Sequence, residues 1–444
     1  MKKSVWIVLS GIIILSSCTQ KKGDYRKLTS DPLLYCKTVK KLNDIVMENN
    51  FPPIIASRNY TYANIAAYEC IAAGDSNYIS LSGQIKHLPP MPKPAAGKEI
   101  DFSLAALLSF TKVGNAVTFP EGSMMGYYDD LKKMADSAGI PSSILENTIA
   151  FSDSVVTAIM RWSKKDNYAQ TRSAEKYTVI DTPGRWVPTP PAYTSALEPH
   201  WNEIRPMVLD SANQFMPPPP PPFDVTDKNS KYYIEVMKVK NAIDSLTPEQ
   251  QHIADFWDDL GTKLNVSGHI MFVTKKFTPT GHWMNIVGIA SEKAMADFNT
   301  TVYAYTKTSI SMFDAFIECW NVKYTYNTVR PETVINKYFD QNWRPDLQTP
   351  PFPEYTCGHS TVSSAGAEAL TSVFGDHFAY TDTSELEFGI RNRSFKSFRE
   401  AALENNWARF YGGIHFHNSC IVSTEQGRLV GDLINDRLQM KKTK

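Results

Sequence analysis

The spacing of apolar side chains along the chain is mostly helical. Apolar residues recur at every third or fourth position, a period that places them on one face of a helix. The segments with this pattern are residues 54–73, 102–113, 145–162, 232–245, 248–260, 290–322 and about 419–439. Alternation of apolar and polar residues, which would indicate strands, is scarce. The pattern predicts an all-α fold of two packed helical bundles.

A proline-rich stretch separates the two predicted bundles. It holds Pro183, Pro188 and an unbroken proline run from Pro217 to Pro222. Proline lacks an amide donor and has a fixed φ, so an extended connection is expected here rather than a helix. A docking site for a proline-binding partner is the alternative to a spacer packed over the surface. The predicted organisation is an N-terminal bundle at 25–181, a connection at 182–224 and a C-terminal bundle at 225–444.

The first residues have the layout of an export signal. Lys2 and Lys3 precede an apolar run at residues 5–15, and small residues then lead to Cys18. Leu15-Ser16-Ser17-Cys18 resembles the bacterial lipobox, after which a lipidated cysteine becomes the new N-terminus. We therefore expect a signal peptide at 1–17, a tether at 18–24 and an exported protein held at the bacterial cell envelope by lipid on Cys18 alone. An uncleaved anchor or an ordinary signal is the alternative.

Composition narrows the possible partners. The chain has 444 residues, with 46 Lys and Arg against 46 Asp and Glu, so no net field attracts nucleic acid, and no nucleic-acid partner is expected. Without Cys18, five of the 6 cysteines remain at wide spacing, and they form neither a disulfide framework nor a CxxC zinc motif. A small-molecule substrate is the expected partner.

Two segments of the last third place cations and a helix start near each other. Lys323 and Arg330 are nearly two helical turns apart and share a face, and Pro331 then ends that helix. Taken alone, the pair could be a solvated face. Prolines at 350–353 precede a small-residue helix whose N-terminus, near Gly358 and His359, favours an anion. Gly358 allows close backbone approach, and His359 can transfer a proton.

A third segment adds another arginine and another histidine. The predicted helix through Arg409 runs into Gly412-Gly413, which turns the chain so that His415 opens the next helix. Arg409 and His415 can therefore converge across the turn. A surface arginine and a capping histidine would explain this piece alone.

Together, Lys-x6-Arg-Pro, Gly-His at a helix start and Arg-x5-His resemble the signature of a known superfamily. It contains the type 2 phosphatidic acid phosphatases and the vanadium-dependent haloperoxidases. The resemblance implies that vanadate, or phosphate in the same site, is bound by Lys323, Arg330, Cys357, Gly358 and Arg409. It implies that His415 is the vanadate ligand or the phosphoryl nucleophile, that His359 is the acid/base, and that Lys323 polarises peroxide in a haloperoxidase.

Further positions resemble the soluble haloperoxidases over roughly residues 250–435. Phe352 matches an aromatic residue that precedes the Gly-His turn, and Trp320 and Asp314 match positions before Lys323. Asp259, in Phe256-Trp257-Asp258-Asp259, matches an acid that orients an active-site arginine.

Two positions depart from the superfamily pattern. Cys357 stands where a serine usually donates to the oxyanion, and a thiol is a weaker donor. Ser419 stands where an aspartate usually orients the third-segment histidine, so His415 is expected to lack a carboxylate partner and to be a poorer nucleophile. The serine argues against efficient phosphatase chemistry, whereas an oxidisable cysteine argues against a durable haloperoxidase.

Two other histidines are candidates for functional residues. His282, before a predicted helix, either lines the pocket entrance or is a packed residue. His415 and His417 share a loop, but no carboxylate or cysteine completes a ligand set, so no metal-cation site is predicted. The preferred function is a haloperoxidase-like enzyme that binds vanadate and oxidises halide with hydrogen peroxide. The alternatives are a phosphomonoesterase with a histidine nucleophile and a non-catalytic phosphate- or vanadate-binding lipoprotein.

Overall fold

The computed structural model describes residues 24–118, 123–267 and 269–442. The expected signal peptide, Cys18 and nearly all of the expected tether lie outside these residues. Within the described part, no helix is both long enough and apolar enough to cross a membrane.

Local sequence determines where many of the helices begin. Asp101 accepts a hydrogen bond from the amide of Leu104, and Asp297 accepts one from Thr300, so each caps a helix through its carboxylate. Thr247 and Gln250 form a reciprocal capping box. These short polar side chains satisfy amides that the helix itself leaves unpaired.

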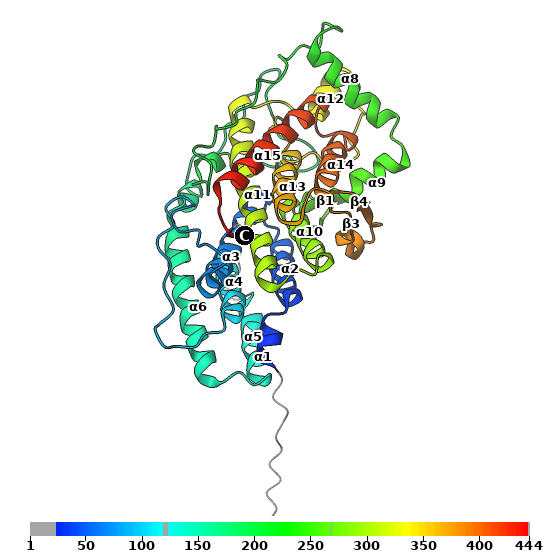
Figure 1. Cartoon of the computed structure of the whole chain (residues 1–444). Coiled ribbons are helices and arrows are strands. Elements are labelled where there is room, and N and C mark those ends of the chain that lie inside the picture. Colours follow the sequence, from blue (N-terminus) through cyan, green and yellow to red (C-terminus); the bar gives the residue numbers. More distant parts are fainter. Residues whose placement is uncertain (1–23, 119–122, 268, 443–444) are drawn as a thin grey trace, which may run out of the picture.

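The N-terminal half is a helical layer, drawn in blue and cyan in Figure 1. Its helices are α1 (Tyr25–Thr29), α2 (Pro32–Glu48), α3 (Pro53–Gly74), α4 (Phe102–Val117), α5 (Met125–Ser137), α6 (Ser142–Ser163) and α7 (Tyr168–Thr171). Helix α3 is buried along nearly its whole length and packs on α4 and on the C-terminal half.

The C-terminal half is the second helical layer. Its helices are α8 (Lys231–Asp244), α9 (Pro248–Phe256), α10 (Pro279–Lys293), α11 (Phe298–Tyr326), α12 (Pro331–Tyr338), α13 (Gly358–Phe374), α14 (Phe398–Tyr411) and α15 (His417–Arg437). Helix α11 is central and lies against α3, α13 and α15. At Gly427, a side chain on α15 would clash with the Thr361 carbonyl of α13, so the glycine permits their close approach. One apolar core runs through both halves, from Tyr25 to Met440.

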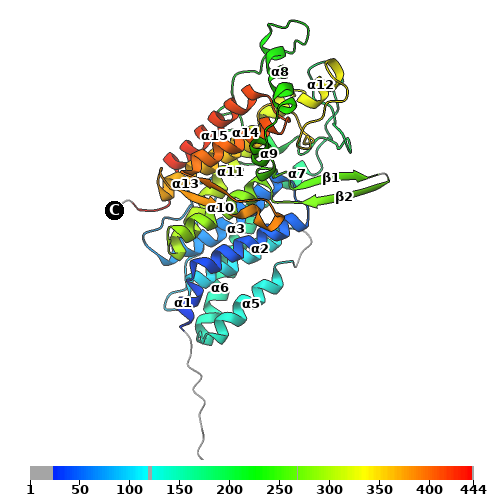
Figure 2. The same ribbon diagram turned by 90° about the vertical axis from the view of Figure 1, so that its right-hand side faces the viewer.

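Two pairs of short strands pack outside the helical layers. Strands β1 (Thr262–Ser267) and β2 (Ile270–Lys275) form an antiparallel hairpin that projects from the side of the molecule in Figure 2. Strands β3 (Tyr380–Asp382) and β4 (Arg393–Phe395) pair beside the single-turn helix η2 (Ser384–Phe388). The all-α prediction is confirmed, although the β1–β2 hairpin was not predicted.

The structure corrects two predicted helices. The apolar period over 290–322 belongs to two helices, because α10 ends at Lys293, Met295 has a positive φ, and Asp297 caps α11. The helix predicted at 248–260 ends at Phe256. The connection at 182–224 contains the one-turn helix η1 (Trp201–Glu203) and otherwise extended or turn structure.

Candidate active site

The three signature segments meet at one buried point in the C-terminal half. Lys323 lies in the last turn of α11, Arg330 precedes α12, and Arg409 lies near the end of α14. The side chains of Lys323, Arg330 and Arg409 are 0% exposed. Three buried cations this close together repel one another and are costly without an anion. The solvated-face interpretation is therefore excluded.

Arg330 joins the segments through backbone carbonyls. Its Nε donates to the Phe352 carbonyl at 2.9 Å and its Nη1 to the Ile414 carbonyl at 2.9 Å. The same Nη1 lies 3.1 Å from Nε2 of His415. Its Nη2 is buried and has no hydrogen-bond partner among the described residues. Burial lowers the pKa of Arg330 to about 10.

Arg409 is oriented by a carbonyl and not by the predicted acid. Its Nη1 donates to the Trp257 carbonyl at 2.8 Å, whereas its buried Nε has no partner among the described residues. Oδ1 of Asp259 instead lies 3.0 Å from Nδ1 of His282. The prediction that Asp259 orients an arginine is therefore wrong, because the residue two positions earlier contacts Arg409 through its backbone.

Lys323 lies over two aromatic rings and binds backbone oxygens. Its Nζ donates to the carbonyls of Pro353 (2.9 Å), Glu354 (3.0 Å) and Thr356. Nζ is 5.0 Å from the Phe352 ring centre and 5.7 Å from that of Trp320. Burial lowers the pKa of Lys323 to about 8. Trp320 and Phe352 are thus placed at the cation cluster, as expected.

His415 has a carboxylate partner that the sequence did not predict. Nδ1 of His415 lies 2.8 Å from Oε1 of Glu354, and both side chains are 2% exposed. The same oxygen accepts from the Phe416 amide at 3.2 Å. Glu354 thus holds the proton on Nδ1 and leaves the lone pair of Nε2 facing the arginines. The expectation that Ser419 leaves His415 without a carboxylate is wrong, because an acid 61 positions earlier takes that place.

His359 lies at the start of α13 with a free ring nitrogen. Its Nε2 is buried and has no hydrogen-bond partner among the described residues. Burial, together with the nearby Arg409 charge, holds the pKa of His359 well below its ordinary value. A neutral imidazole in this position can accept a proton. No side chain caps α13, so its first amides have no capping side-chain acceptor.

Cys357 and Ser419 occupy the two departing positions. The Cys357 amide donates to the Ser423 hydroxyl at 2.7 Å, and that hydroxyl donates to the Ser419 carbonyl at 2.5 Å. Burial raises the pKa of Cys357, but hydrogen bonding from Cys420 and the proximity of His415 bring it well below its ordinary value. The buried Ser419 hydroxyl has no partner among the described residues. The five described cysteines are free thiols.

Asp314 lies away from the cation cluster. Its carboxylate accepts hydrogen bonds from the backbone amides of Met207, Val208 and Leu209 at 2.7 to 3.0 Å. It therefore fastens the proline-rich connection to α11 and makes no contact with the site.

Solved structures and one family description match this arrangement. The family described as "VCPO second helical-bundle domain" matches residues 304–442. The crystal structure of a bacterial vanadium-dependent iodoperoxidase is 42% identical, with a TM-score of 0.87, and the match covers 93% of this chain and 98% of the other. The chain belongs to the vanadium-dependent haloperoxidase family.

More distant haloperoxidases share the fold. The apo form of a bacterial vanadium-dependent chloroperoxidase is 16% identical, with a TM-score of 0.66, and the match covers 87% of this chain and 94% of that one. For the holo form the identity is 16% and the TM-score 0.66, with coverage of 94% and 96%. None of the curated proteins matches the chain. The match to the iodoperoxidase includes the N-terminal half, so the likeness extends beyond the 250–435 region identified from sequence.

The residues of this site fit a tetrahedral oxyanion such as vanadate. Among the described residues, buried donors of Arg330 and Arg409 and a ring nitrogen of His359 have no hydrogen-bond partner. Buried donors are normally satisfied, so their presence together indicates a ligand with several oxygens. His415 offers a nitrogen at the same place.

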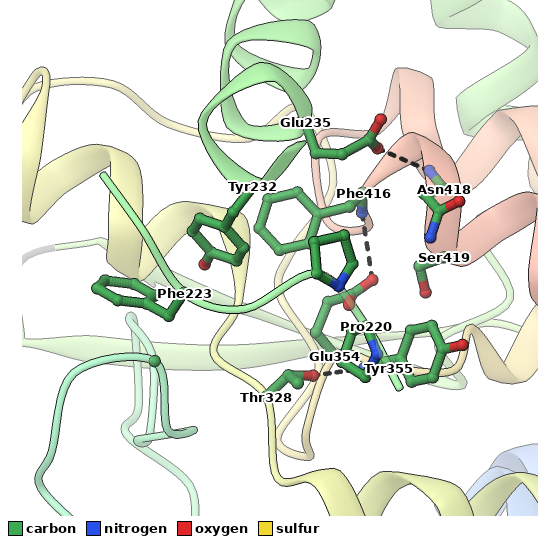
Figure 3. A pocket seen from close by; sticks show the side chains of 12 residues that line it. Pro220, Phe223, Tyr232, Glu235, Thr328, Glu354, Tyr355, Phe416, Asn418 and Ser419 are labelled. Carbon is green, nitrogen blue, oxygen red and sulfur yellow. Dashed lines mark hydrogen bonds between the residues drawn. The ribbon is translucent and has the colours of Figure 1, made fainter. Parts of the chain in front are cut away.

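Two cavities adjoin the site. One cavity, of about 300 Å³, reaches Phe352 from the surface and is also lined by Leu197 and Pro351. The other is drawn in Figure 3, where Glu354 reaches toward the Phe416 amide and Ser419 lies nearby. Phe352, which lines the first cavity, has its ring centre 5.0 Å from Nζ of Lys323. Glu354, which lines the second cavity, pairs with His415.

Proposed function

We propose that the protein binds vanadate and oxidises iodide with hydrogen peroxide. The single observation that carries the proposal is the set of unpartnered nitrogens on Arg330, Arg409 and His359 around His415. The choice of iodide is supported by the 42% identical relative, an iodoperoxidase. Iodide is also the most easily oxidised of the common halides in chemical terms.

The residues around the site have separable roles in this proposal. Bound vanadate supplies the Lewis-acid centre at which hydrogen peroxide becomes able to oxidise halide. Arg330 and Arg409 neutralise oxygen charge through their free N–H groups, and Lys323 adds a third positive charge. His415 binds through Nε2 because Glu354 keeps the proton on Nδ1.

Proton movement falls to His359. Its low pKa keeps the imidazole neutral, and with the ring proton on Nδ1 the free Nε2 can take a proton from incoming peroxide and return it to the oxygen that leaves. Lys323, whose pKa is near 8, stays charged at neutral pH and polarises the bound oxygens. The aromatic rings of Trp320 and Phe352 cover this lysine and exclude water from it.

A phosphomonoesterase is the second candidate, and one observation favours it. The Glu354–His415 pair is the arrangement that a histidine nucleophile needs, and it removes the objection based on Ser419. In that reaction His415 attacks phosphorus and His359 protonates the leaving oxygen.

The deciding experiment uses the mature chain loaded with orthovanadate. Iodide- and peroxide-dependent triiodide formation is expected, and it should vanish without vanadate and in His415→Ala. Release of phosphate from a generic phosphomonoester, blocked by vanadate, would instead establish the phosphatase. Anion binding with neither activity would establish a non-catalytic binder.

We further propose that the protein is exported and lipid-anchored. The support is the basic start, the apolar run and the lipobox-like Leu15-Ser16-Ser17-Cys18. Metabolic labelling with a clickable fatty acid tests it, because Cys18→Ala should abolish the label.

A further inference from the structure

A second buried polar cluster lies on the other side of Trp257 from Arg409. It contains Asp259 after α9, His282 in α10, Asp382 at the end of β3 and Glu385 in η2. All four are 0% exposed. Four separate elements thus contribute one ionisable side chain each to a single enclosed point.

His282 is held between carboxylates on both ring nitrogens. Its Nε2 lies 2.9 Å from Oδ2 of Asp382. Its Nδ1 lies 3.0 Å from Oδ1 of Asp259 and 3.7 Å from Oε1 of Glu385. One ligand atom from each of Asp259, His282 and Glu385 lies within 4.8 Å of the other two.

Several carboxylate oxygens in this cluster lack partners. Oδ2 of Asp259 and both oxygens of Glu385 are buried with no hydrogen-bond partner among the described residues. Lys276 is the nearest ammonium, and its Nζ is 3.9 Å from Glu385, beyond hydrogen-bond distance. Buried acceptors of this kind are costly when nothing donates to them.

The cluster holds more carboxylates than cationic partners. Three carboxylates face one imidazole and one ammonium. A divalent cation with neutral His282 and charged Lys276 would balance the three carboxylates.

We propose that Asp259, Nδ1 of His282 and Glu385 bind a divalent transition-metal ion, with zinc the best fit. Two carboxylates and an imidazole are ligands of this class, whereas calcium and magnesium prefer oxygen alone. Asp382 is the orienting partner, because a metal-bound histidine commonly donates its other N–H to a carboxylate. The sequence predicted no metal-cation site. For His282 it left two interpretations open, a residue at the pocket entrance and a packed residue.

The ion has a structural role, because the site is closed to solvent. It ties together the end of α9, α10, β3 and η2. The Trp257 ring stacks on His282 with centres 4.7 Å apart, and the Trp257 carbonyl accepts from Arg409 at 2.8 Å. The cation therefore helps to hold the carbonyl that orients Arg409. The inference does not depend on the proposed halide oxidation.

Metal content and stability test the proposal on the whole mature chain. Protein purified without chelator is measured by inductively coupled plasma mass spectrometry, then stripped with a chelator and reloaded with zinc, manganese or calcium salts. We expect about one zinc or manganese ion per chain and a melting temperature that falls on stripping and recovers on reloading. Substoichiometric metal with no such recovery, or recovery with calcium alone, would overturn the proposal.

Matched variants test which residues bind the ion. Glu385→Gln should lose the metal, whereas Glu387→Gln, an exposed change in the same short helix, should keep it. Asp382→Asn removes only the orienting partner and should weaken zinc binding about 10- to 100-fold. If Glu385→Gln does not fold, Asp382→Asn decides alone. Unchanged metal affinity in the variants that fold contradicts the site.

Discussion

The anion pocket and the acidic cluster are both buried around histidine, but their charges are opposite. Around His415, buried N–H donors of Arg330 and Arg409 have no hydrogen-bond partner among the described residues. Around His282, carboxylate oxygens of Asp259 and Glu385 have none there either. In each cluster one ring nitrogen is fixed by a carboxylate, Glu354 in the first and Asp382 in the second.

The difference shows how one side chain serves two kinds of ligand. A carboxylate fixes the tautomer in both places, and the neighbours of the second nitrogen then select an anion or a cation. Trp257 separates the two clusters, since its carbonyl faces Arg409 and its ring faces His282. The comparison predicts that each cluster can be disabled without emptying the other.

The largest expected effect comes from removing one arginine of the pocket. Arg330→Met deletes a charged donor to the oxyanion, a loss of about 2–3 kcal/mol, or roughly 30- to 150-fold in vanadate affinity. Isothermal titration measures it. Metal content should not change, which keeps the two clusters distinct.

Arg344→Met is the matched control, because Arg344 is exposed. It should bind vanadate as the unmodified chain does. An Arg330→Met protein that folds and retains full vanadate affinity would remove Arg330 from the site.

The next effect comes from the carboxylate that orients His415. Glu354→Gln should lower vanadate affinity and iodide oxidation about 10- to 100-fold, because the neutral amide no longer fixes the proton on Nδ1. Steady-state kinetics and titration measure both. Glu235→Gln is the control, since Glu235 binds the Asn418 amide at 2.7 Å in the cavity of Figure 3 and does not touch His415. Equal losses in the two variants would mean a general packing effect.

The parts of the site that lie close together in sequence could be predicted, whereas its long-range pairs could not. Gly358 and His359 begin α13, as local rules predict. The prediction that Lys323 and Arg330 share one helix is wrong, because α11 ends at Tyr326 and Arg330 lies in extended backbone just before α12. The Glu354–His415 pair joins residues 61 positions apart, and no local pattern shows it. Glu354 does stand between a proline and a tyrosine just before the Gly-His turn, and that position was the available signal.

The fold shows the same division. The helical period predicted α3 and α6 within a few residues. Helix α6 buries one face, whereas α3 is buried on all sides but still has apolar residues at helical spacing. The same period predicted one continuous helix across the break before α11, because apolar spacing does not reveal a capping residue such as Asp297. The contact from Trp257 to Arg409 is made by a backbone carbonyl, which residue identity cannot reveal.

A pH effect of moderate size should appear in the pocket. Burial places the pKa of Lys323 at about 8, below its ordinary value, so its charge is present below that pH and lost above it. Vanadate affinity should therefore fall by up to about tenfold for each pH unit above the pKa of this one group.

Lys323→Arg separates the lysine from the ionisation of vanadate itself. Arginine keeps its charge to much higher pH, so the part of the decline due to the side chain should disappear in this variant. An identical decline in both proteins would assign the effect to vanadate alone. Zinc affinity is measured over the same pH range, and its pH dependence should be the same in the unmodified chain and in Lys323→Arg.

The smallest effect is expected at Cys357, where the pocket departs from its family. A hydroxyl is a stronger donor than a thiol, so Cys357→Ser should bind vanadate about two- to fivefold more tightly. The variant should also lose less activity during prolonged exposure to peroxide, because the buried Cys357 thiol lies beside His415 and has a lowered pKa that favours oxidation. Residual activity after timed exposure measures this. Cys36→Ser changes the more exposed Cys36 and should give no protection. Protection by Cys36→Ser alone would move the oxidation out of the pocket and leave Cys357 as a packing residue.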